Sequence, residues 1–147
     1  RDADIVGLDP NRLILARHDP SRGVWVPLLS SVDVSARRVR AKTRHFSIFQ
    51  VMQSIPSDTV ATVRVVPNPF RPRRGHVAMG FFNLPPTSRV RIYTVAGEIV
   101  RDITGNAAGL AVWDGKNEAG MNAASGVYYA LIQGQGGNKA VTVAIER

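Results

Sequence analysis

The chain has 147 residues, 44% of them hydrophobic, which is enough apolar material to build a buried core and to exclude a wholly disordered protein. Its 19 basic residues outnumber its 11 acidic residues and give a formal net charge of +8. The chain has no cysteine, which excludes disulfides, thiolate catalysis and cysteine-ligated zinc or iron–sulfur sites. This length suits one ordinary domain or two small ones.

The basic excess is spread evenly along the chain. Residues 1–53 hold 9 basic and 5 acidic residues, and residues 54–147 hold 10 and 6. Such a balance suits nucleic acid, an anionic glycan, a membrane surface or an acidic protein as partner, and it also promotes solubility without any partner. No apolar run approaches the roughly 20 residues that span a bilayer, so we expect no membrane-spanning helix.

The first residues, Arg1-Asp2-Ala3-Asp4, include neither an initiating methionine nor the apolar segment of a signal peptide. We therefore expect the chain to be a processed or excised portion of a longer one.

Residues 1–53 predict the later strands of a larger β-domain. About four strands are expected, at residues 12–17, 24–29, 37–44 and 45–52. Pro27 favours a sheet edge or a bulge, and residues 30–35 are a polar segment. A β-sandwich usually needs about seven strands, so we expect this partial module to be completed by upstream sequence or by a neighbouring subunit.

A row of basic residues, Arg38, Arg40, Lys42 and Arg44, alternates through the third of these strands and would share one face. Such a face could bind phosphates or an anionic glycan. Nucleic-acid binding normally adds exposed aromatic residues or a recognition helix, and neither is evident. We favour a solvated face, or a basic interface for acidic residues of a neighbouring subunit.

Residues 54–60 form a short polar connector, and we place the domain boundary there. Beyond it, seven short strands with regular turn signals are expected near residues 63–66, 77–81, 90–94, 99–103, 110–113, 127–132 and 141–145. No segment has a helical period with caps. This pattern is typical of an antiparallel β-sandwich, so the whole chain is predicted to be all-β.

The loop after residue 112 is dense in turn formers, namely Asp114, Gly115, Asn117, Gly120 and Gly126. Asp114 and Glu118 could in principle bind a hard cation, but two carboxylates lack the rest of a ligand set. The three histidines show no metal-ligand spacing. We therefore expect an ordinary surface connection, with no metal and no cofactor.

Five blocks of sequence in the second part carry a family signal. They lie at residues 66–70 (V-P-N-P-F), 83–85 (N-L-P), 90–101 (V-R-I-Y-T-V-A-G-E-I-V-R), 113–120 (W-D-G-K-N-E-A-G) and 125–129 (S-G-V-Y-Y). The residues that define them are Pro67, Asn68, Pro69, Phe70, Gly97, Trp113, Asp114, Gly115, Gly120, Gly126 and Tyr128. Together they resemble the Ig-like domains at the C-termini of many secreted bacterial proteins, including the flagellar hook-capping type and the sorting domains of type IX secretion. Thr94 departs from the pattern, which usually has Asp or Asn there.

This resemblance implies an Ig-like sandwich, a cell-surface or extracellular setting, a role in sorting, attachment or spacing, and no catalysis. It does not separate a sorting signal from a structural domain. Since such signals are often removed after export, a mature chain that keeps the domain would favour the structural role.

A second, shorter resemblance lies in the first part. Trp25, Asp33 and His45-Phe46-Ser47 resemble the end of ZU5-like β-sandwich domains, some of which cleave themselves between Phe and Ser. The resemblance implies that the Ser47 hydroxyl attacks the Phe46 carbonyl while His45 takes a proton. We favour the simpler interpretation, in which His45 is a polar strand residue, Phe46 is in the core and Ser47 is exposed.

The sequence thus predicts a non-enzymatic C-terminal region of an exported bacterial protein. One alternative is a structural subunit of an extracellular filament or lattice assembled by strand addition. The other alternative is a self-cleaving module at Phe46-Ser47.

Overall fold

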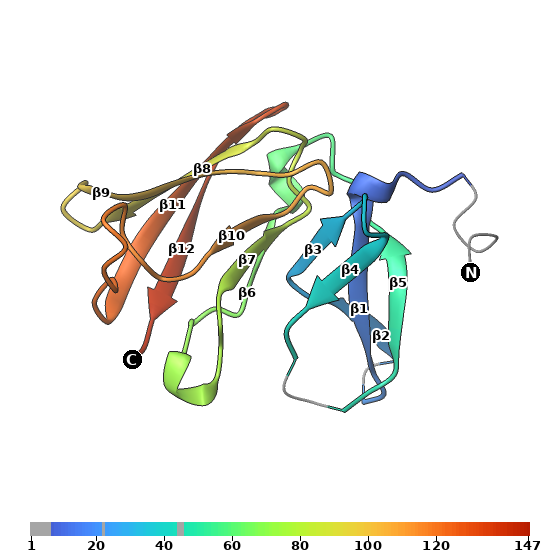
Figure 1. Ribbon diagram of the computed structural model, residues 1–147. Helices are drawn as coiled ribbons and strands as arrows, with labels where there is room; N and C mark the ends of the chain where they lie inside the picture. Colours follow the sequence, from blue (N-terminus) through green and yellow to red (C-terminus); the bar gives the residue numbers. More distant parts are fainter. Residues whose placement is uncertain (1–6, 22, 44–45) are drawn as a thin grey trace. The chain divides into compact units, whose positions relative to one another are not determined.

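The computed structural model describes residues 7–21, 23–43 and 46–147, and all the strand ladders within them are antiparallel (Figure 1). Twelve strands and three short 3-10 helices, without any α-helix, make up the regular structure of these residues. The all-β prediction is confirmed. No helix in the described ranges is long and apolar enough to cross a bilayer. The chain forms two compact units, Arg1–Ile55 and Pro56–Arg147.

The first unit contains one three-stranded sheet and one hairpin. In the sheet, β1 (Leu13–Asp19) lies between β2 (Val24–Pro27) and β5 (Phe49–Gln53). The hairpin pairs β3 (Ser30–Asp33) with β4 (Arg38–Ala41). Strand β2 lies at a sheet edge, as its proline predicted, because proline lacks the N–H that a central strand would donate.

The hairpin corrects the predicted count of four strands, because the polar segment after residue 30 forms a fifth. Turn chemistry explains it: the Asp33 carboxylate accepts hydrogen bonds from the Ala36 amide at 2.9 Å and the Ser35 hydroxyl at 2.7 Å. These bonds lower the pKa of Asp33. The Arg37 amide donates to the Val34 carbonyl at 3.2 Å and closes the turn. A tight polar turn therefore aligns two short strands that have little apolar content.

The first unit buries little apolar surface. Among its described residues, only Leu13 and Ala16 are buried hydrophobic residues, whereas Phe46, Ile48 and Ile55 are exposed. The interpretation of Phe46 as a core residue was wrong, since its side chain is fully exposed. The β3–β4 hairpin contacts β1, but so few apolar side chains are buried that this unit has only a thin core.

The second unit is a two-sheet sandwich (Figure 1). Its seven strands are β6 (Arg64–Val66), β7 (Met79–Phe82), β8 (Arg89–Thr94), β9 (Ile99–Thr104), β10 (Ala111–Trp113), β11 (Gly126–Gly134) and β12 (Gly137–Ile145). One sheet has the order β10-β7-β6 and the other β12-β11-β8-β9. The predicted seven-stranded Ig-like sandwich is confirmed.

The core of this unit is formed by inward-facing residues from both sheets. Phe81 and Trp113 come from the three-stranded sheet, and Ile92, Ile132 and Val143 come from the four-stranded one, all without solvent exposure. Alternate residues on these strands point inward because the side-chain period of a strand is two. The apolar alternation of the sequence therefore becomes the interior of the sandwich.

Residues 56–60, expected to be part of a connector, lie within the second compact unit. Val60 begins the short helix η3 (Val60–Thr62), is only 4% exposed and joins the core of the sandwich. The ammonium group of Lys139 donates to the Ala61 carbonyl at 2.6 Å, which fixes the start of β12 against this helix.

Candidate functional site

A loop with many hydrogen bonds follows β10 in the second unit, and we call residues 113–126 the tryptophan loop. The Trp113 ring is fully buried, and its indole N–H donates to the Lys116 carbonyl at 2.8 Å. The Asp114 carboxylate accepts from the Lys116 amide at 3.1 Å. Gly115 adopts a φ of +74°, and a Cβ atom there would lie 2.6 Å from the Phe70 ring. Glycine is therefore required at this point by both backbone and packing.

The remainder of the tryptophan loop folds back on itself. The Asn117 amide donates to the Met121 carbonyl at 2.8 Å, and the Asn117 side chain accepts from the Met121 amide at 2.9 Å. Gly120 has a φ of +76° and donates its N–H to the Asn117 carbonyl. The Ala123 amide donates to the Gly115 carbonyl at 2.9 Å and closes the loop. The residues predicted to form turns here, such as Asn117 and Gly120, do so in the structure.

Tyr128 connects the tryptophan loop to the core. Its hydroxyl donates to the Ala124 carbonyl at 2.7 Å, and its ring meets the Trp113 ring edge-on, with centroids 5.5 Å apart. A tyrosine that bonds back to the backbone a few residues upstream is a recurrent corner in Ig-like sandwiches. Burial raises the pKa of Tyr128.

The block at residues 66–70 covers an edge of the four-stranded sheet. The Asn68 side chain accepts from the Ala144 amide and donates to the Thr142 carbonyl, both at 3.0 Å. The Phe70 backbone then pairs with the Ala144 carbonyl and the Glu146 amide. The prolines on either side of Asn68, Pro67 and Pro69, follow cis peptide bonds. Donors and acceptors of β12 that would otherwise be open to another chain are therefore occupied.

The turn between β8 and β9 explains the one departure from the family pattern. Gly97 has a φ of +85° and donates its N–H to the Thr94 carbonyl at 3.0 Å. The Thr94 hydroxyl accepts from the Glu98 amide at 3.2 Å. A threonine oxygen thus acts as a local backbone acceptor, which is the role that an Asp or Asn side chain commonly has in turns.

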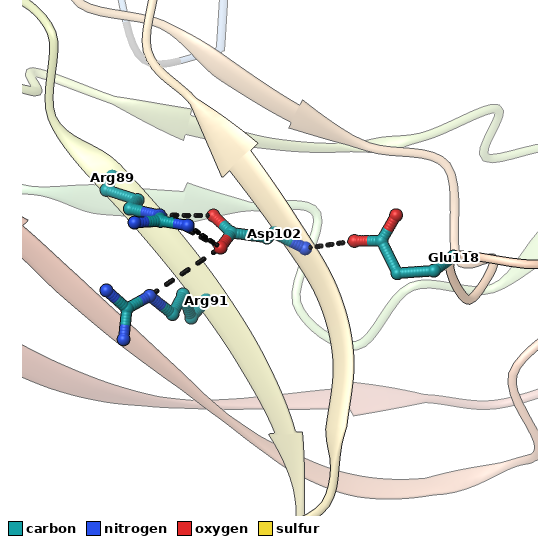
Figure 2. A network of polar contacts seen from close by, with 4 residues as sticks. All are labelled: Arg89, Arg91, Asp102 and Glu118. Carbon is teal, nitrogen blue, oxygen red and sulfur yellow. Dashed lines mark hydrogen bonds and ion pairs between the residues drawn. The ribbon is translucent and has the colours of Figure 1, made fainter.

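A polar network joins β8, β9 and the tryptophan loop (Figure 2). The Arg89 guanidinium holds the Asp102 carboxylate through two of its nitrogens, at 2.8 and 2.5 Å, and Arg91 lies 3.6 Å away. The Glu118 carboxylate accepts from the Asp102 amide at 2.7 Å and so links the tryptophan loop to β9. The hydrogen bonds from Arg89 lower the pKa of Asp102 despite the opposing effect of its burial.

These contacts already use the acidic side chains of the tryptophan loop. The carboxylates of Asp114 and Glu118 each accept from a backbone amide of a different residue. Within the described parts of the chain, no three histidine or acidic side chains are grouped so as to hold a metal ion. The arrangement fixes the tryptophan loop and links it to β9.

Sequence reasoning missed Arg147. Its guanidinium donates to the Ala123 carbonyl at 2.7 Å and the Gly115 carbonyl at 2.9 Å, and its amide donates to the Ser125 hydroxyl. An arginine at the end of a strand carries no local signal of such contacts, which join residues more than 20 positions apart.

The basic row predicted in the first unit is only partly on a strand. Arg38 and Arg40 are exposed at alternate positions of β4, whereas Lys42 is exposed just beyond the end of that strand. Arg44 lies outside the described residues. The structure therefore places two of the four cations on one strand face.

The proposed self-cleavage site is also only partly described, because His45 lies outside the described residues. Ser47 is half-buried, not exposed, and its hydroxyl donates to the His18 carbonyl at 2.9 Å. That bond anchors the segment to β1. Cleavage at Phe46-Ser47 stays a prediction, and the intact mass of a longer precursor tests it, since a single uncut species would end it.

No family model matches the chain, and no curated protein matches it either. Among solved structures, the chain is similar to PorZ, described as an essential bacterial surface component of the type-IX secretion system of human oral-microbiomic Porphyromonas gingivalis. The match has a TM-score of 0.54 and 21% sequence identity, and it covers 67% of this chain. It covers only 14% of PorZ, so this chain spans a small part of the length of that protein. Such a likeness shows a shared fold.

Proposed function

We propose that this chain is the non-catalytic C-terminal region of an exported bacterial protein, and that its Ig-like unit serves cell-surface sorting, attachment or spacing. The main support for the proposal is that residues of the five sequence blocks build the core of the second unit. Phe70, Trp113 and Tyr128 form connected parts of one core, and Gly115 fits against Phe70. A sequence pattern devoted to building a stable, closed module suits a domain that is recognised or displayed as a whole.

Two further points support this function. The acidic side chains of the tryptophan loop are bonded to backbone amides, which argues against their use in acid–base chemistry. The fold is shared with part of a surface component of a type IX secretion system, which makes that system a reasonable setting for a test.

Export tests the proposal directly. A reporter protein is fused ahead of the complete chain and produced in Porphyromonas gingivalis, both in a strain with PorZ and in one without it. We expect the reporter at the cell surface or in the medium of the first strain only. Retention inside the cell in both strains would contradict the proposal.

The mass of the exported reporter separates the two forms of this function. Loss of the second unit after export identifies a sorting signal that is removed. An exported reporter that keeps the whole chain identifies an attachment or spacing domain.

The first unit favours one alternative, a subunit of an extracellular filament or lattice. Strands β2 and β5 are both edges of their sheet, and Ile48 and Val51 next to or within β5 are exposed. An added strand from a neighbour would pair such an edge and cover apolar side chains. Light scattering at low and high salt tests this: large, salt-sensitive assemblies would support a lattice, and a salt-stable monomer would exclude it.

A further inference from the structure

A cluster of arginines on the second unit shares only Arg147 with the contacts described above. An open hollow of about 200 Å³ lies between the 3-10 turn η4 (Pro72–Arg74) and the chain beyond β12. Its lining consists of Arg71, Arg73, Arg74, Glu146 and Arg147. Four arginines and one glutamate therefore line the hollow, which leaves a local excess of positive charge.

Two of these guanidinium groups are held in place. Arg71 donates to the Glu146 carboxylate at 2.6 Å. Arg147 is fixed by the carbonyls of Ala123 and Gly115. A guanidinium has five N–H donors, so each of these side chains keeps donors beyond those already used. The two guanidinium groups are therefore already oriented before a ligand binds.

The other two arginines are exposed on a rigid turn. The Arg74 amide donates to the Arg71 carbonyl at 3.0 Å, and the Gly75 amide donates to the Pro72 carbonyl at 2.8 Å. Gly75 ends the turn with a φ of +89°. Across the described part of the chain, neither Arg73 nor Arg74 has a side-chain hydrogen bond or ion pair. Their donors are available to a ligand.

The volume and the lining residues of the hollow indicate which kind of ligand it could bind. Its volume lies below the roughly 300–1,000 Å³ of sites that enclose a whole small molecule, so it suits a single group. Planar guanidinium groups match the paired oxygens of phosphate, and sulfate has the same tetrahedral shape. No aromatic residue lines the hollow, so it lacks the platform on which nucleic-acid bases stack. We propose that this hollow binds a tetrahedral oxyanion, a phosphate or sulfate group, either free or carried on an anionic polysaccharide.

Titration of the complete chain tests the proposal, with amide shifts followed by ¹H–¹⁵N NMR. The probes are inorganic sulfate, inorganic phosphate and dextran sulfate, with neutral dextran as the polymer control. We expect saturable shifts at the amides of Arg71, residues 73–75, Gly115 and Arg147. Binding of the free ions identifies a free oxyanion as sufficient, whereas binding of dextran sulfate alone identifies a carried group.

Matched variants locate the site by charge. We expect R74Q to weaken binding by about threefold and R73Q/R74Q by about tenfold or more, because charge-assisted hydrogen bonds are lost. R64Q removes the same charge from an exposed position on β6 of the same unit, and we expect less than about a twofold change. An equal loss in R64Q and R74Q would overturn the proposal. Shifts confined to residues 38–42, or no saturable binding of any charged probe, would also overturn it.

Discussion

The two units of the chain differ in how completely each closes its own core. The second unit sets a three-stranded sheet against a four-stranded one and buries large side chains such as Trp113 and Phe81 completely. The first has a three-stranded sheet and a hairpin, and its buried apolar residues are Leu13 and Ala16 among those described. Regular hydrogen-bonded strands are thus insufficient for a core, because stability requires two apolar faces that cover each other.

The units also differ in how they treat sheet edges. In the second, Asn68 and Phe70 occupy the outer hydrogen-bonding groups of β12. In the first, β2 and β5 are the outer strands of a small sheet. Covered edges prevent unwanted pairing, whereas open ones are templates for another strand. This difference motivates the proposal of display for the second unit and the alternative of strand addition at the first.

The largest expected effect comes from exchanging the one tryptophan of each unit for alanine. W113A removes a fully buried ring and should lower the free energy of unfolding by about 3–5 kcal/mol. W25A removes a ring that is 36% exposed and should change the free energy of unfolding by about 1 kcal/mol or less. Urea unfolding followed by circular dichroism measures both. Equal losses would remove the contrast between the two cores.

Two glycine substitutions sharpen the account of the second core. G115A and G97A both place alanine at positive φ, which costs about 1–2 kcal/mol. Only G115A also forces a Cβ against the Phe70 ring, so it should lose about 1–3 kcal/mol more. The difference between their urea midpoints isolates the packing contribution. Identical midpoints would show that Phe70 moves aside freely.

Tyr128→Phe tests the corner that ties the tryptophan loop to the core. Loss of the bond to Ala124 should lower the free energy of unfolding by about 0.5–1.5 kcal/mol at neutral pH. The folded-state pKa of Tyr128 is raised above its usual value of 10.0, so its stabilisation is complete below that pH and is lost as the pH rises through the folded pKa. The gap between wild type and variant should therefore shrink in alkali. A gap that widens there would contradict this assignment.

The smallest effect is expected for D102N in the network of Figure 2. The folded-state pKa of Asp102 is lowered, so its contribution is present above 3.8 and is lost as the pH falls through the folded pKa. We expect a urea midpoint slightly below that of wild type at pH 7 and equal to it in strong acid. Because the pair with Arg89 is solvent-accessible, added salt should reduce the difference. A salt-independent difference would point to a packing role instead.

Local patterns predicted most of the fold. Alternating apolar residues and turn formers were enough to place all seven strands of the second unit, because both signals lie within each segment. Strand β3 was missed because it carries little apolar content and its pairing with β4 depends on the turn at Asp33. The roles of Asn68 and Arg147 depend on partners far away in the sequence, and no local pattern contains them.

Hydrogen exchange on the complete chain tests the central contrast most directly, because it reads the stability of both units in one sample at residue level. We expect the amides of β8 and β11 to exchange more slowly than those of β1 by at least about tenfold. We also expect the amide of Ala144, bonded to Asn68, to be protected although β12 lies at a sheet edge. Equal protection of β1 and β11 would contradict the claim that only the second unit completes its own core.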